Sequence, residues 1–133
     1  MEDEILDSEP RVLIVDRSEE NREVLETALS RRGFSVLTAH RLPEGVRLAR
    51  QCAPDLIVLD VDSTHDDPAG ASAELFGHGD GARPPVVMLG TIRRGATPAV
   101  DREFVAKPYH YGPLIRRIEE LLGTSGARSL RTA

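Results

Sequence analysis

The sequence predicts an α/β fold in which a parallel sheet is covered by helices on both faces. Short apolar segments alternate along the chain with segments whose apolar residues recur at helical spacing. The apolar segments do not alternate apolar with polar residues, which is typical of strands buried on both faces of a parallel sheet. With 133 residues and one cysteine, the chain is expected to form one domain without an internal disulfide.

The first predicted strand is VLIV at 12–15, and a helix follows it. Ser18 is in position to cap the start of that helix, and Gly33 is a typical residue at a helix end. Between them, apolar residues recur on one helical face: Val24, Leu25, Ala28 and Leu29.

The next two predicted strands are FSVLTA at 34–39 and DLIVLD at 55–60, with a helix between them. Pro43 favours the first turn of that helix, because the amide hydrogen that proline lacks would have no partner there. The third strand is apolar until it ends on an acid. The first strand is apolar throughout, and an acid follows it directly.

The second half of the chain predicts two more strands and one regular helix. The strands are PVVML at 85–89 and EFVAK at 103–107, and the helix begins near Pro113. Its apolar stripe consists of Leu114, Ile115, Ile118, Leu121 and Leu122. Glycine and proline are frequent on either side of the fourth strand, so the third and fourth helices are expected to be reduced. Only a weak helix is expected at 69–76, and a turn or two before the fifth strand.

Residues 1–10 are an acidic N-terminal arm, residues 11–122 form the predicted domain, and residues 123–133 are expected to be a flexible tail. No apolar run approaches the ~20 residues of a membrane span, and the N-terminus lacks the apolar core of a secretory signal. A cytoplasmic protein without membrane binding is therefore expected. The net charge of −5 and the low aromatic content argue against direct nucleic-acid binding.

Charged residues gather at one edge of the predicted sheet. Asp16 and Arg17 follow the first strand, Asp60 and Asp62 lie at the end of the third, and Lys107 lies at the end of the fifth. In an open parallel sheet, ligands bind beyond the carboxyl ends of the strands, so these side chains are expected to share a site. Carboxylates hold Mg²⁺ through oxygen, and lysine neutralises a phosphate oxygen. The first loop is not glycine-rich, which argues against a dinucleotide or P-loop site.

The chain resembles the receiver domains of response regulators in bacterial two-component signalling. The motifs that carry the resemblance are VLIVD, the Asn and Arg of ENRE, PDLIVLD, PVVML, and VAKP before the last helix. The resemblance implies a flavodoxin-like, doubly wound sheet of five strands in the order 2-1-3-4-5. It also implies a histidine kinase or phosphotransfer protein as phosphoryl donor, and a downstream protein target.

Functional residues carried over by this resemblance fall on four positions of the sequence. Asp60 resembles the phosphoacceptor, and Asp16 resembles the first member of the acidic pair that organises Mg²⁺. Lys107, followed by Pro108, resembles the lysine that senses the phosphoryl group. Asp62 falls where the family supplies a backbone carbonyl to the metal, and its carboxylate could replace a missing ligand. The expected metal set is therefore Asp16, Asp60 and Asp62.

Three positions depart from the family pattern. Arg17 replaces the second acid of the pair, which is expected to weaken Mg²⁺ binding or to abolish it. Gly90 replaces the small hydroxyl residue that ends the fourth strand, and Thr91, one residue later, is the candidate substitute hydroxyl. Phe104 stands at the aromatic switch position and has no hydroxyl group.

Two functions remain open at this point. The first is a single-domain receiver that accepts a phosphoryl group on Asp60 at an atypical Mg²⁺ site. The second is a phosphorylation-independent pseudo-receiver, an interaction module in which Arg17, Asp60 and Lys107 form a static salt-bridge cluster. An enzyme is not expected beyond self-catalysed phosphoryl transfer to and from Asp60, because no dedicated general acid or base is placed near it. The charged face of the last helix could also support a homodimer.

Overall fold

The computed structural model describes residues 9–63, 70, 75, 84–91 and 102–123. Its sheet has five strands in the order β2-β1-β3-β4-β5, and all pairs are parallel. The strands are β1 Arg11–Val15, β2 Ser35–Ala39, β3 Leu56–Asp60, β4 Val86–Gly90 and β5 Arg102–Ala106. The predicted parallel sheet and its strand order are therefore confirmed.

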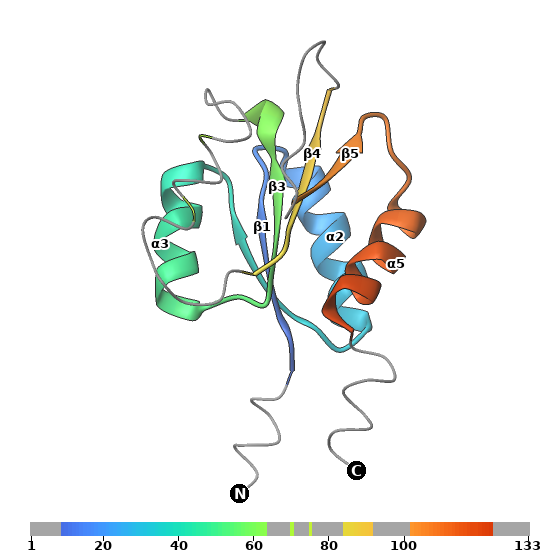
Figure 1. Ribbon diagram of the computed structural model, residues 1–133, viewed down its shortest axis with the longest axis horizontal. Coiled ribbons are helices and arrows are strands. Elements are labelled where there is room, and N and C mark those ends of the chain that lie inside the picture. The colour runs from blue at the N-terminus through green and yellow to red at the C-terminus, as the bar shows by residue number, and fades with distance from the viewer. Residues whose placement is uncertain (1–8, 64–69, 71–74, 76–83, 92–101, 124–133) are drawn as a thin grey trace, which may run out of the picture.

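Helices cover both faces of the sheet (Figure 1). The helices α2, Glu19–Arg31, and α5, Tyr111–Leu122, lie together on one face, and α3, Leu42–Cys52, lies on the other. A short 3₁₀ turn, η1, spans Val61–Ser63 and follows β3 directly. Among the described residues, no helix is long and apolar enough to cross a membrane.

Two apolar clusters fill the space between the sheet and the helices. Side chains of one strand alternate between them, as Ile14 packs toward α2 and α5 while Leu13 and Val15 pack toward α3. The strands β3 and β4 are buried along their whole length. Burial on both faces explains why their sequences lack a polar alternation.

Local signals set most of the helix boundaries. The Ser18 hydroxyl accepts the Asn21 amide at 3.2 Å and caps α2 as predicted. The C-cap residue is Arg32, and Gly33 follows it with a φ of +93°, a backbone conformation that suits glycine. Val24 is 37% exposed, so its place in the predicted apolar stripe was wrong; it lies at the margin of the buried face.

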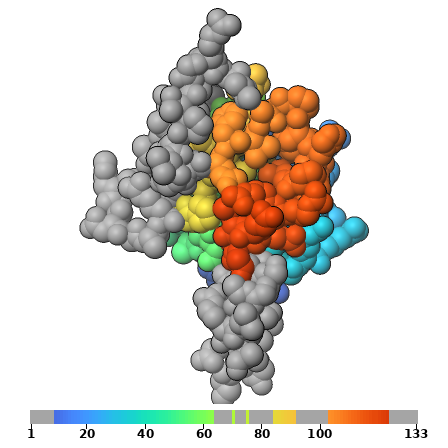
Figure 2. Space-filling model, turned by 45° about the vertical axis from the view of Figure 1, so that its right-hand side comes forward, coloured from blue at the N-terminus to red at the C-terminus, as the bar shows by residue number. Residues whose placement is uncertain are grey.

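The remaining helices begin slightly earlier than predicted. The helix α3 begins at Leu42, one residue before Pro43, and α5 begins at Tyr111, two residues before Pro113. Both prolines thus occupy the first turn, where a missing amide hydrogen costs little. Figure 2 shows β5 and α5 side by side on one face. The two elements are joined by Arg117 of α5, which donates to Glu103 of β5 at 2.8 Å.

Several expectations fall on parts of the chain outside the described residues. They are most of the N-terminal arm at 1–10, the tail after Gly123, and the short helix between the fourth and fifth strands. The weak helix at 69–76 is described only at Gly70 and Leu75, which are both helical. Leu75 is buried in the cluster on the α3 side of the sheet.

Candidate functional site

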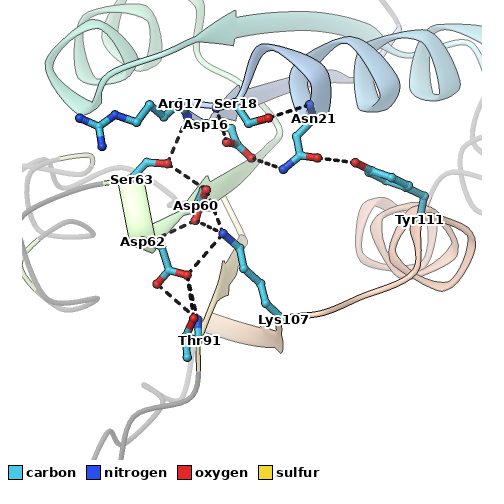
Figure 3. A network of polar contacts seen from close by, with 10 residues as sticks. All are labelled: Asp16, Arg17, Ser18, Asn21, Asp60, Asp62, Ser63, Thr91, Lys107 and Tyr111. Carbon is cyan, nitrogen blue, oxygen red and sulfur yellow. Dashed lines mark hydrogen bonds and ion pairs between the residues drawn. The ribbon is translucent and has the colours of Figure 1, made fainter.

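Two acids are buried at the carboxyl edge of the sheet. Asp16 follows β1 and is 1% exposed, and Asp60 is the last residue of β3 and is 4% exposed. Because β1 and β3 are adjacent and parallel, with Val15 opposite Leu59, the two acids are brought to the same edge. The predicted convergence of Asp16 and Asp60 is therefore seen in the structure (Figure 3).

Both carboxylate oxygens of Asp60 accept hydrogen bonds from this chain. The Lys107 ammonium lies 3.1 Å from Oδ1 and 3.2 Å from Oδ2. The Asp62 amide donates to Oδ1 at 3.0 Å, and the Ser63 hydroxyl donates to Oδ2 at 2.9 Å. Lys107 thus lies beside Asp60, where it can neutralise charge on that group.

The Asp16 carboxylate has only uncharged donors among the described residues. Its Oδ1 accepts the Ser18 amide at 2.8 Å, and its Oδ2 faces the Asn21 side-chain amide at 3.5 Å. Burial and the neighbouring Asp60 raise the pKa of Asp16 to about 6. A hard cation beside Asp16 and Asp60 would relieve the repulsion between their negative charges, so the pair fits a divalent ion with oxygen ligands.

The Asp62 carboxylate does not turn toward Asp16. It accepts the Thr91 amide at 3.1 Å, the Thr91 hydroxyl at 3.0 Å, and lies 3.3 Å from the Lys107 ammonium. Partial burial acts to raise the pKa of Asp62, but these donors outweigh it and the pKa is lowered. Within the described ranges, no three acidic, histidine or cysteine side chains are grouped as a metal site. Asp62 as a third metal ligand therefore stays a prediction.

Arg17 directs its side chain away from the two buried acids (Figure 3). Its backbone amide donates to the Ser63 hydroxyl at 3.2 Å, so it contributes to the site through its main chain. In the part of the chain that the structure describes, Lys107 pairs with Asp60 and the Arg17 guanidinium does not. The three-residue cluster of Arg17, Asp60 and Lys107 expected from the sequence is therefore not formed: Lys107 contacts Asp60, and the long, exposed Arg17 side chain lies outside.

Gly90 leaves no room for a side chain at the end of β4. A Cβ atom there would lie 2.5 Å from Cγ2 of Val61, 3.2 Å from Oδ1 of Asp62 and 3.5 Å from the Phe104 ring. The volume that a hydroxyl side chain would need is therefore filled by η1 and by Phe104. Thr91, the candidate substitute hydroxyl, is exposed and donates to Asp62.

Ser63 is a site residue that the sequence reasoning missed. Its hydroxyl accepts from the Arg17 amide and donates to Asp60, so it joins the loop after β1 to the end of β3. The available signal was a hydroxyl three residues beyond an acid at a strand end, which a tight 3₁₀ turn brings back toward that acid.

Asn21 and Tyr111 form a second contact that the sequence reasoning missed. The Tyr111 hydroxyl donates to Oδ1 of Asn21, which sets the orientation of the amide so that its nitrogen faces Asp16. The two residues are 90 positions apart, and no local pattern predicts their pairing. An open groove beside the site is lined by Asn21, Lys107, Pro108, Tyr109 and Tyr111.

The chain is similar in sequence to several transcriptional and response regulators, although no family model matches it. "Probable transcriptional regulator ycf27" of Guillardia theta is 32% identical over 122 residues, covering 88% of this chain and 47% of that protein. "Transcriptional regulatory protein PrrA" of Mycobacterium leprae is 31% identical over 125 residues, covering 90% and 53%. "Response regulator MprA" of Mycobacterium tuberculosis is 31% identical over 118 residues, covering 84% and 50%. The chain thus spans about half the length of these relatives.

Solved receiver structures share the fold. A response regulator receiver protein from Sinorhizobium medicae has a TM-score of 0.72 at 17% identity, covering 88% of this chain and 97% of that one. A CheY-like receiver domain from Methylobacillus flagellatus has a TM-score of 0.71 at 14% identity, covering 86% and 99%. At such identities, the likeness shows the fold.

Sequence and fold both relate this chain to response-regulator receivers. The chain has the fold of response-regulator receiver domains, and over about half of their length it is similar in sequence to transcriptional and response regulators. The resemblance carried by VLIVD, PDLIVLD and VAKP is confirmed at this level.

Proposed function

We propose that this receiver accepts a phosphoryl group on Asp60 from a histidine kinase or a phosphotransfer protein and signals to a downstream protein target. The observation that carries this proposal is the contact of Lys107 with both oxygens of Asp60, at 3.1 and 3.2 Å, beside the buried acid Asp16. An acceptor carboxylate, a cation for the transferred group and a second acid therefore meet at the ligand-binding edge of the sheet.

In the transfer step, an Asp60 oxygen forms a bond to phosphorus while the bond from phosphorus to the donor nitrogen breaks. The bonding pair returns to the donor, and the anionic carboxylate needs no general base. Lys107 neutralises charge on the phosphoryl oxygens as a point charge. Before it reacts, the attacking oxygen must lose one of the hydrogen bonds that it accepts. For Oδ2, the hydrogen bond from the Ser63 hydroxyl is the one with an uncharged side-chain donor.

Asp16 and Asp60 are the residues that would hold Mg²⁺, and Asp62 would contribute through its backbone carbonyl or its carboxylate. When bound, Mg²⁺ supplies positive charge that neutralises the carboxylates and the phosphoryl oxygens. Since Arg17 directs its guanidinium outward, it does not pair with the two acids in place of a cation. Arg17 still adds one positive charge near the loop and stands where the family has a second acid, so weak Mg²⁺ binding is expected.

A second candidate function is a phosphorylation-independent interaction module. It is favoured by the saturation of Asp60, whose side chain is only 5% exposed and already has donors from Lys107, Ser63 and the Asp62 amide. In that case the acid would serve the packing of the site, because removing one member of a buried charge pair is costly. A homodimer and a cytoplasmic location stay predictions under either function.

Intact mass after incubation with acetyl phosphate separates the two functions. We expect wild type to gain the mass of one phosphoryl group when Mg²⁺ is present, and Asp60→Asn to gain none. Asp55→Asn is a matched control, because Asp55 is exposed and its carboxylate binds the Arg11 amide at the opposite end of the strands. An adduct on Asp60→Asn, or none on wild type, would contradict the proposal.

A further inference from the structure

One carboxylate oxygen of Asp62 collects donors from the ends of two different strands. Thr91, directly after β4, donates its amide at 3.1 Å and its hydroxyl at 3.0 Å to Oδ2. Lys107, directly after β5, places its ammonium 3.3 Å from the same oxygen. Asp62 itself lies in η1 after β3, so a single side chain joins the carboxyl ends of three adjacent strands (Figure 3).

Gly90 makes this arrangement possible. A side chain at residue 90 would meet the Val61 methyl at 2.5 Å and Oδ1 of Asp62 at 3.2 Å, so η1 would have to shift away from the end of β4 to admit it. The loss of a side chain at Gly90 and the presence of an acid at Asp62 are therefore two parts of one local structure.

The Lys107 ammonium is shared between two acids. It lies 3.1 Å from Oδ1 of Asp60 and 3.3 Å from Oδ2 of Asp62, and no phosphoryl group is needed for either contact. Charge-assisted hydrogen bonds of this kind are stronger than neutral ones. The contact between Asp62 and Lys107 therefore belongs to the unmodified protein.

We propose that Asp62 is a positioning residue, a built-in anion that holds the carboxyl end of β4 to Lys107 in the unmodified protein. The amide and hydroxyl of Thr91 are then satisfied by a carboxylate of this chain and do not depend on an anion bound at Asp60. Any anion that binds at Asp60 competes with Asp62 for the ammonium of Lys107. This inference goes beyond the proposed function, because it concerns the unmodified protein and does not require that Asp60 accepts a phosphoryl group.

The Thr91 amide reports directly on this contact in the unphosphorylated protein. Nuclear magnetic resonance would measure its proton shift and its hydrogen-exchange rate in wild type and in Asp62→Ala. We expect exchange to accelerate roughly tenfold or more in Asp62→Ala, because the amide loses a charged acceptor. Asp62 is partly exposed, so this variant is expected to fold.

Asp55→Ala is the matched control for a lost carboxylate acceptor. The Asp55 carboxylate accepts the Arg11 amide at 2.7 Å, so this variant should release the Arg11 amide and leave Thr91 unchanged. Unchanged Thr91 exchange in Asp62→Ala would overturn the proposal, as would equal acceleration in Asp55→Ala. Asp60→Asn should leave the Thr91 amide protected; loss of protection there would show that Asp60, and not Asp62, holds the β4 end. None of these outcomes depends on whether acetyl phosphate labels the protein.

Discussion

The ammonium of Lys107 lies 3.1 Å from Oδ1 of Asp60, although β4 lies between β3, which ends on Asp60, and β5, which Lys107 follows. The contact crosses the end of β4, where Gly90 has no side chain. One cation thus serves Asp60 and Asp62, while the nearby Asp16 has only uncharged donors among the described residues. The site therefore keeps an excess of negative charge beside Asp16, which is the condition under which a divalent cation would bind.

Replacing Asp16 by asparagine should stabilise the metal-free protein at neutral and alkaline pH. Burial and the neighbouring Asp60 raise the pKa of Asp16 from 3.8 to about 6, so this acid is harder to ionise in the folded state than in the unfolded state. The resulting cost is absent below about pH 4, grows up to about pH 6, and is constant above that.

Urea unfolding at two pH values measures this effect. We expect Asp16→Asn to raise the free energy of unfolding by about 1–3 kcal/mol at about pH 8, and to have no such effect near pH 4. Asparagine keeps an oxygen that can accept the Ser18 amide, so the loop after β1 retains that contact. A variant less stable than wild type at about pH 8 would contradict the pKa shift.

A side chain at Gly90 should destabilise the protein. The methyl group of Gly90→Ala would lie 2.5 Å from Cγ2 of Val61, and such overpacking typically costs about 1–3 kcal/mol. The double variant with Val61→Ala should recover part of this loss in urea unfolding. Gly112→Ala is the control, because the nearest atom to its new methyl group is 4.0 Å away. Equal effects of Gly90→Ala and Gly112→Ala would rule out the steric explanation.

Two neighbouring tyrosines should respond differently to the loss of a hydroxyl group. The Tyr111 hydroxyl donates to Asn21, so Tyr111→Phe should lower the free energy of unfolding by about 1 kcal/mol. The Tyr109 hydroxyl is buried without a hydrogen-bond partner among the described residues, so Tyr109→Phe should be neutral or slightly stabilising. Thermal or urea unfolding of the two variants measures how much stability each one loses. A larger loss in Tyr109→Phe than in Tyr111→Phe would contradict the prediction.

Much of the fold could be predicted from the sequence because burial on both faces leaves a strong local signal. Uninterrupted apolar runs predict the buried strands β1, β3 and β4. Asp16 follows β1 and Asp60 ends β3, so the same signal predicts both acids at one edge of the sheet. Pro43 and Pro113 located two helix starts to within two residues, since proline is favoured throughout the first turn.

The details of the site could not be predicted in the same way. The outward direction of Arg17 is a choice among side-chain rotamers of a long exposed residue, and the sequence does not determine it. The sequence pattern indicates only that Gly90 lacks a hydroxyl group, whereas in the structure the absence of its side chain admits Val61 and Asp62 over the end of β4. That role depends on the path of η1, which is a tertiary contact without a sequence pattern.

The central claim, that Asp60 remains a phosphoacceptor although Arg17 replaces an acid, is tested most directly by a Mg²⁺ titration. The measurement is the fraction of protein carrying a phosphoryl group, by intact mass, at increasing Mg²⁺ and fixed acetyl phosphate. We expect wild type to be labelled with a saturable Mg²⁺ dependence, and Arg17→Asp to reach half-saturation at roughly tenfold to hundredfold lower Mg²⁺. If wild type forms no adduct at any Mg²⁺ concentration while Arg17→Asp does, the claim is contradicted, and the protein acts as a phosphorylation-independent module.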